Sequence, residues 1–193
     1  MRVLALPFAA AILSFPLAAS ADEPAHAAQT EEHANPPERK NAIQADLGLA
    51  VVGLAYERML LKRIALQLEA QLFGTWFGPI FDRPNLAGFG AQVRPTWFIT
   101  HDGPRGLYLA PYFRVNRVRG EKDFAEGYNV GFSAGLFLGY SWVFAERFNL
   151  RVGAGAQYMS YHVDVPVGAG GQDTRLEFRE FFPALDLVLG YAF

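Results

Sequence analysis

The pattern that decides the fold lies in residues 181–193, which read Phe181-Phe182-Pro183-Ala184-Leu185-Asp186-Leu187-Val188-Leu189-Gly190-Tyr191-Ala192-Phe193. Successive side chains of a β-strand point to opposite faces of the sheet. One face here carries large apolar residues, namely Leu185, Leu187, Leu189, Tyr191 and Phe193. The other carries small or polar residues, namely Ala184, Asp186, Val188 and Gly190. This alternation predicts a strand with one apolar and one polar face.

The same alternation recurs in the chain before this segment. It predicts strands at about 42–51, 54–60, 64–77, 86–99, 107–118, 128–144 and 149–163. It is clearest in 128–144, where Val130 and Phe132 oppose Gly131 and Ser133. Most of these segments reach the roughly 9–11 residues that a tilted strand needs to cross a bilayer. With the final strand, the even set predicts an all-β fold, an eight-stranded antiparallel up-and-down transmembrane β-barrel.

The connections and the aromatic residues fit such a barrel. Long loops are expected at 78–85, 119–127 and 164–180, and short turns at the opposite end, with a tight first turn near Val52-Gly53 as an exception. Two aromatic girdles are expected. One contains Trp97, Trp142, Phe144, Tyr191 and Phe193, and the other contains Trp76, Phe77, Tyr128 and Tyr161. Pro95 and Pro111 each remove a ladder donor, so both are expected near strand ends.

Periodicity also fits a soluble barrel that keeps its apolar face inside. The polar face is rich in Gly, Ser, Gln and Arg, which suits a narrow lumen better than a solvent surface. Lysine, a common residue of solvent-exposed strands, occurs only at Lys40, Lys62 and Lys122. We therefore expect the polar face inside and the apolar face in lipid.

The first residues predict export. Arg2, the apolar run Leu4–Leu17 and the Ala19-Ser20-Ala21 motif indicate a cleaved signal peptide at 1–21, with a membrane anchor as the alternative. Residues 22–41 are rich in Pro, Ala and charge and predict a disordered periplasmic tail, which leaves 42–193 for the barrel. The chain has no Cys and no block of basic residues, which argues against a thiolate site and a nucleic-acid partner.

Charged residues on the polar face form the candidate site. They are Asp46, Glu57, Glu69, Asp186, Arg94, Arg114 and Arg151. An unpaired charge in a narrow lumen costs several kcal/mol, so these acids and bases are expected to pair and to plug the interior. The alternative is a narrow pore that uses the same charges.

Residues 42–193 resemble the small eight-stranded outer-membrane β-barrels of the OmpA and OmpX type, through their architecture and terminal Phe193. The resemblance implies a monomer in the bacterial outer membrane, in contact with outer-membrane lipid and, as a further candidate, lipopolysaccharide. It also implies that Tyr191 and Phe193 form the signal read by the barrel-assembly machinery. Arg117, Arg119 and Lys122 form a basic cluster where lipopolysaccharide phosphates would lie.

An enzyme is the remaining alternative, because some barrels of this kind modify lipid A. Ser160, His162 and Asp164 share one face of a strand, but neighbours at this spacing are about 7 Å apart. The lipid A deacylase barrels carry His-x-Ser, whereas this chain has Ser-x-His. The sequence therefore predicts a structural or surface-interaction role without catalytic residues, cofactor or metal, with a lipid A-modifying enzyme or a narrow pore as alternatives.

Overall fold

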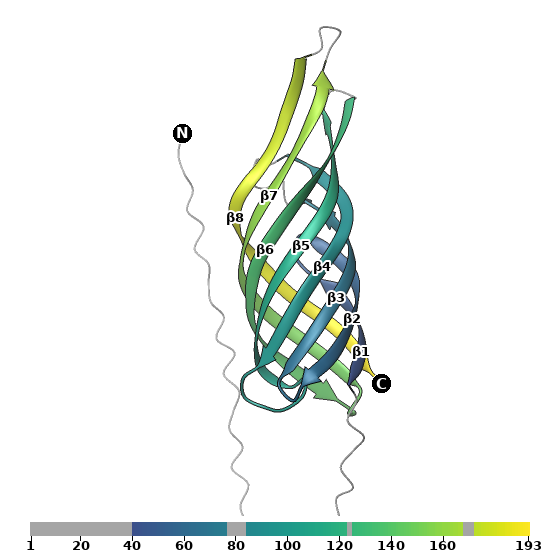
Figure 1. Ribbon diagram of the computed structural model, residues 1–193, viewed down its shortest axis with the longest axis vertical. Helices are drawn as coiled ribbons and strands as arrows, with labels where there is room; N and C mark the ends of the chain where they lie inside the picture. The colour runs from purple at the N-terminus through teal and green to yellow at the C-terminus, as the bar shows by residue number, and fades with distance from the viewer. Residues whose placement is uncertain (1–39, 77–83, 123–124, 168–171) are drawn as a thin grey trace, which may run out of the picture. The chain divides into compact units, whose positions relative to one another are not determined.

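The computed structural model describes residues 40–76, 84–122, 125–167 and 172–193. The predicted signal peptide and the predicted tail up to residue 39 lie outside these residues. The described chain forms eight antiparallel strands that close into a barrel in chain order (Figure 1). The strands are β1 (Asn41–Leu47), β2 (Val51–Leu61), β3 (Ile64–Gly74), β4 (Leu86–Phe98), β5 (Gly106–Lys122), β6 (Ala125–Phe144), β7 (Phe148–Val167) and β8 (Gln172–Ala192). The described part of the chain contains no helix that is long and apolar enough to span a membrane.

The apolar face of the barrel points outward. The exposed fraction is 69% for Leu54, 53% for Leu138 and 51% for Leu189, although all three are large aliphatic side chains. Gln67 and Arg94 point inward and are buried. A continuous apolar exterior on a closed sheet is the arrangement of a barrel in lipid. The predicted orientation of the two faces is therefore confirmed, and the soluble barrel with an apolar interior is excluded.

The first hairpin differs from the prediction. β1 ends at Leu47 and β2 begins at Val51, so the turn occupies 48–50 and not Val52-Gly53. Gly48 allows this tight turn, because a Cβ at that position would lie 2.8 Å from Cγ2 of Val51. The turn comes before Val51 and not after it, which places the Val51 side chain on the inner face, where it is buried.

Two hairpins in the second half of the chain, β5–β6 and β7–β8, are longer than predicted. β5 and β6 stay paired as far as Lys122 and Ala125, and β7 and β8 as far as Val167 and Gln172. The predicted loops 119–127 and 164–180 are therefore largely strand. The ladder between β6 and β7 stops at Phe132 and Ser160. Beyond that point β7 and β8 continue as a two-stranded ribbon, at the upper end of the barrel in Figure 1.

The two strand prolines lie opposite each other. The β4–β5 ladder pairs Val93 with Phe113 and Trp97 with Leu109, and it is interrupted between these pairs, at Pro95 and Pro111. Because proline has no N–H to donate, placing both in one gap confines the loss to one short stretch of one ladder. On their other sides, β4 still pairs with β3 and β5 with β6.

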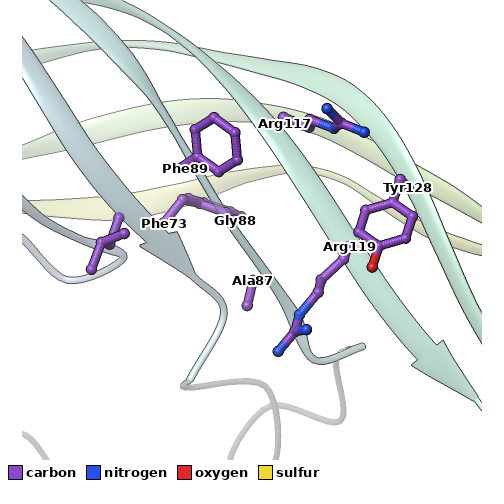
Figure 2. A pocket seen from close by; sticks show the side chains of 8 residues that line it. Phe73, Ala87, Gly88, Phe89, Arg117, Arg119 and Tyr128 are labelled. Carbon is purple, nitrogen blue, oxygen red and sulfur yellow. The ribbon is translucent and has the colours of Figure 1, made fainter.

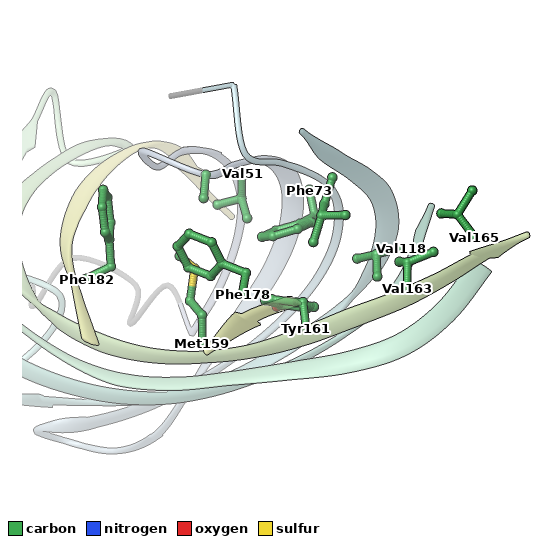
Figure 3. Packing of buried hydrophobic residues seen from close by; sticks show 11 residues of the cluster. Val51, Phe73, Val118, Met159, Tyr161, Val163, Val165, Phe178 and Phe182 are labelled. Atoms are coloured by element: carbon green, nitrogen blue, oxygen red, sulfur yellow. The ribbon is translucent and has the colours of Figure 1, made fainter. Parts of the chain in front are cut away.

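An apolar cluster fills part of the interior (Figure 3). Val51, Phe73, Met159 and Phe178 are buried in it. Tyr161, which the sequence placed in an aromatic girdle, is buried here too and stacks on Phe73 with ring centroids 4.5 Å apart. The girdle assignment of Tyr161 is wrong because its strand position is inward-facing. Phe77 lies outside the described residues.

Candidate functional site

The lumen holds all seven charged residues that the sequence singled out, and all are buried. They come from seven of the eight strands: Asp46 from β1, Glu57 from β2, Glu69 from β3, Arg94 from β4, Arg114 from β5, Arg151 from β7 and Asp186 from β8. Each has inward parity on its strand, so burial follows from the pleat of the sheet. Closure of the barrel then brings these residues together although they are far apart in sequence.

Arg94 joins two acids across the lumen. One terminal nitrogen, Nη1, lies 2.7 Å from Oδ1 of Asp186 and 3.3 Å from Oδ2 of Asp46. The Nε–H of Arg94 donates to Oε1 of Gln67 at 2.6 Å. Tyr108 donates its hydroxyl proton to the second oxygen of Asp186. The guanidinium thus links β4 to β8, which lie on opposite sides of the ring.

Arg151 and Glu57 form a second, separate ion pair. Two nitrogens of the Arg151 guanidinium each lie 2.5 Å from a different carboxylate oxygen of Glu57. Gln44 donates to the same carboxylate at 3.1 Å. The guanidinium carbon also lies 5.1 Å from the ring centroid of Phe98. Such bidentate arginine–carboxylate pairs are among the stronger charge-assisted hydrogen bonds in proteins.

Arg114 and Glu69 are connected through a glutamine. Gln92 donates its amide N–H to Oε2 of Glu69 at 2.7 Å. Its carbonyl oxygen accepts from Nη2 of Arg114 at 2.7 Å. The side chain of Gln92 therefore lies between the base and the acid. Gln67, which accepts from Arg94, also donates to Oε2 of Glu69 at 3.3 Å. The Arg94 and Arg114 groups thus form one connected polar network, and the Arg151–Glu57 pair stands apart from it.

The sequence placed the neutral members of these polar groups on the inward face but did not predict their hydrogen bonds to the charged residues. They are Gln44, Gln67, Gln92, Gln157, Tyr108 and Tyr112, all of them buried. Tyr112 donates its hydroxyl to Gln157 at 2.8 Å and lies under the Arg114 guanidinium, 4.9 Å from carbon to ring centroid. Strand parity was enough to place them inside, but which groups they bond depends on the closure of the barrel.

Small residues on β6 and β7 make room for the larger side chains. A Cβ at Gly139 would lie 2.5 Å from the hydroxyl oxygen of Tyr108, and one at Gly153 would lie 2.6 Å from it. These distances are shorter than a real carbon–oxygen contact. The glycines on the lumen face therefore accommodate Tyr108, which in turn reaches Asp186.

The residues predicted as an assembly signal lie at the end of the barrel where the chain leaves β8. Tyr191 and Phe193 point outward with the apolar face and are exposed. The Tyr191 hydroxyl accepts a hydrogen bond from Arg147 at 2.7 Å, and its ring packs edge-on against Phe148. The Phe193 N–H donates to the carbonyl of Asn41 at 2.8 Å. Their role in assembly stays a prediction.

Ser160, His162 and Asp164 lie on the outer face of β7 where it leaves the closed barrel. The ring nitrogen Nε2 of His162 lies 2.7 Å from Nδ2 of Asn129. Asp164 lies 3.9 Å from Nε of Arg175 on β8. Within the described residues, no hydrogen bond joins Ser160 to His162, and no group of three or more His, Cys, Asp or Glu is placed to hold a metal ion.

Comparison with known proteins identifies the fold. The sequence matches no protein-family model and no curated protein. The structure is similar to the N-terminal β-barrel domain of OprF from Pseudomonas aeruginosa, with a TM-score of 0.55 and 13% identity over 80% of this chain and 98% of that one. It is also similar to Neisserial surface protein A, with a TM-score of 0.51 and 13% identity over 79% of this chain and 95% of that one.

The chain has the fold of the small outer-membrane β-barrels. At this level of identity the likeness concerns the fold alone.

Proposed function

We propose that this protein is a closed, non-enzymatic barrel of the bacterial outer membrane, with a structural or surface-interaction role. The observation that carries the proposal is the filled interior. Arg94, Arg151 and Tyr108 are among the largest fully buried side chains, and two of them are held in ion pairs. A charge network and an apolar cluster together occupy the space that an open pore would need.

The outward apolar face supports the location. Export by a cleaved signal peptide and insertion by the barrel-assembly machinery are parts of the same proposal. The β7–β8 ribbon supports the surface role, because its outer face is charged where it continues past the closed part of the barrel. Arg175 and Glu177 lie there, and Nε of Arg179 lies 2.7 Å from Oε1 of Glu177.

Single-channel recording in planar bilayers tests whether the lumen is closed. The wild-type barrel is expected to show no steady unitary conductance. The variant Tyr112→Ala removes a large side chain from the lumen and is expected to introduce a leak. Tyr140→Ala is the matched control, because it removes the same atoms from the lipid-facing side of β6.

Two results of this experiment would overturn the closed lumen. Steady, uniform steps from the wild-type protein would establish a narrow pore instead. Equal conductance of the Tyr112→Ala and Tyr140→Ala variants would mean that the lumen side chains do not decide conductance. A mobility shift on heating shows that both variants are folded.

The enzyme alternative is tested on the outer face of β7. The variants Ser160→Ala and His162→Ala are each expected to leave the lipid A of the host unchanged, because His162 contacts Asn129 and not Ser160. The readout is the mass spectrum of lipid A from cells that express wild-type protein, either variant or none. A lipid A species that appears with wild-type protein and vanishes in both variants would establish an enzyme.

A further inference from the structure

A groove of about 420 Å³ lies on the outer surface of the barrel, across β3 to β6. The outward-facing residues that line it are Leu72, Ala87, Phe89, Arg117, Arg119 and Tyr128. The volume falls in the usual range of small-molecule sites, about 300–1,000 Å³. Figure 2 shows Phe89 and Ala87 on one side of the groove, and Arg117, Arg119 and Tyr128 on the other.

The strand register explains the shape of the groove. Ala87 pairs with Arg119, and Arg119 pairs with Tyr128, so these three side chains lie in one row across the sheet. In the row next to it, Leu72 pairs with Phe89, and Phe89 pairs with Arg117. Ala87 is small and its partner on β3 is Gly74, so this row is low on the β3–β4 side and leaves a hollow. The walls are apolar, with Leu72 64% and Phe89 61% exposed.

Two arginines border this apolar hollow. The Arg117 guanidinium carbon lies 5.7 Å from the ring centroid of Tyr128, and both arginines are exposed. Among the described residues, no carboxylate lies within ion-pair distance of Arg117 or Arg119. The arginines of the β7–β8 ribbon differ in this respect, since Arg175 and Arg179 both contact Glu177.

The groove lies at the edge of the apolar band. On β7 and β8 the band ends between the aromatic pair Tyr158–Phe181, with ring centroids 5.3 Å apart, and the polar pair Ser160–Arg179. On β5 the corresponding change occurs between Val115 and Arg117. This edge lies at the opposite end of the strands from Asn41 and Phe193, which are joined by a backbone hydrogen bond.

We propose that this groove binds one lipid of the outer leaflet, a phosphorylated and acylated glycolipid of the lipopolysaccharide type. An acyl chain would lie against Leu72, Ala87 and Phe89, and a phosphate would contact the guanidinium groups of Arg117 and Arg119. Arginine suits phosphate because its planar fork donates two parallel hydrogen bonds. The proposal rests on the outer-membrane location given above and is independent of whether the lumen conducts.

Charge complementarity decides between occupants. A purely apolar ligand would leave Arg117 and Arg119 without an anion among the side chains that the structure describes, and a soluble phosphate would leave the apolar walls exposed. A phosphorylated lipid satisfies both at once, with its head group at the edge of the band and its chain along it. Lys122 belongs to the same predicted basic cluster, but its side chain lies outside the described residues.

The test measures the affinity of the full-length folded barrel in detergent for two probes. The probes are bis-phosphorylated lipid A and the same lipid A after removal of both phosphates. The double variant Arg117→Gln/Arg119→Gln is expected to lose about ten- to a hundredfold in affinity for the first probe and nothing for the second. The variant Ala87→Trp fills the hollow and is expected to weaken the binding of both.

The control is Arg175→Gln/Arg179→Gln, which removes the same charge from the same end of the barrel and is expected to bind both probes like wild type. The proposal fails if the control loses as much affinity as the Arg117/Arg119 variant, because the effect would then be general surface charge. It also fails if Ala87→Trp binds normally, which would leave a head-group contact without an acyl site. Conductance and heat-induced mobility shift, measured on the same variants, show whether the closed and folded barrel itself has been lost.

Discussion

Arg151 and Glu57 are the pair of residues on which the interior depends most directly. Both are buried, and two guanidinium nitrogens of Arg151 each donate a hydrogen bond to a different carboxylate oxygen of Glu57. Removing one partner leaves the other charge in the lumen without compensation, which costs about 3–5 kcal/mol. Arg151→Ala is therefore expected to lower the free energy of unfolding by that amount, measured by urea titration in lipid vesicles.

The double variant Arg151→Met/Glu57→Gln provides the control for this prediction. It removes both charges together and is expected to recover most of the stability that Arg151→Ala loses, because no unpaired charge remains. If the double variant is less stable than Arg151→Ala, the loss comes from packing and not from the unpaired charge.

Asp102 gives a prediction for pH dependence outside the membrane band. It lies in the turn between β4 and β5, where Nε of Arg63 donates to its carboxylate at 2.7 Å. That hydrogen bond holds the pKa of Asp102 below its ordinary value. Because the folded pKa is lowered, the contact stabilises the turn above the ordinary pKa and is lost as the pH falls through the folded pKa.

Carbon NMR of the Asp102 carboxyl group measures this directly. In the variant Arg63→Ala the pKa is expected to rise toward the ordinary value of aspartate, with little effect on overall stability because the pair is exposed. An unchanged titration in the variant would mean that another group lowers the pKa.

At the scale of the element, β7 and β8 each cross from the apolar band into a charged ribbon. The register places Leu185 within the band and His162 beyond its edge, opposite Glu177. Leu185→Arg is expected to cost about 2–4 kcal/mol of folding free energy, as is typical of a charge near the bilayer midplane. His162→Arg is expected to be tolerated, since it places a similar charge opposite an acid.

The same vesicle unfolding assay compares these two variants. Similar losses in both would mean that the band does not end between Tyr158 and Ser160 and that the ribbon also contacts lipid. That result would also move the edge on which the glycolipid site depends.

At the scale of the whole molecule, the orientation of the barrel follows from the two ends of its strands. The chain has no Cys, so single cysteines can be introduced without background. Asp164→Cys lies on the ribbon, and Lys62→Cys lies in the turn between β2 and β3. On intact cells a membrane-impermeant maleimide is expected to label the first and not the second.

Permeabilising the outer membrane is expected to make both sites reactive, which shows that each cysteine can be labelled at all. The reverse pattern on intact cells would place the ribbon in the periplasm. The groove would then lie on the inner leaflet, and a glycolipid of the outer leaflet would be ruled out as its occupant.

The sequence alone determined the strand content and the two faces of the sheet. Alternation is a local property, because each side chain's direction depends only on its place in the pleat. Alternation separated the face of Leu185 from the face of Asp186, and the composition of the polar face, rich in Gly, Gln and Arg and poor in Lys, indicated that it meets the lumen. The same rule would have placed Tyr161 inside and extended the strands through Val165, Leu176 and Phe178, whose alternation continues beyond the predicted segments.

Only the tertiary structure decided which partners meet in the lumen. Arg94 contacts Asp186 because β4 and β8 face each other across a closed ring, and Arg114 reaches Glu69 through Gln92. The groove beside Arg117 likewise requires the register of β3 to β6. Contacts of this kind depend on barrel closure and on the stagger between strands, which are set by the whole sheet and not by the alternation of any one strand.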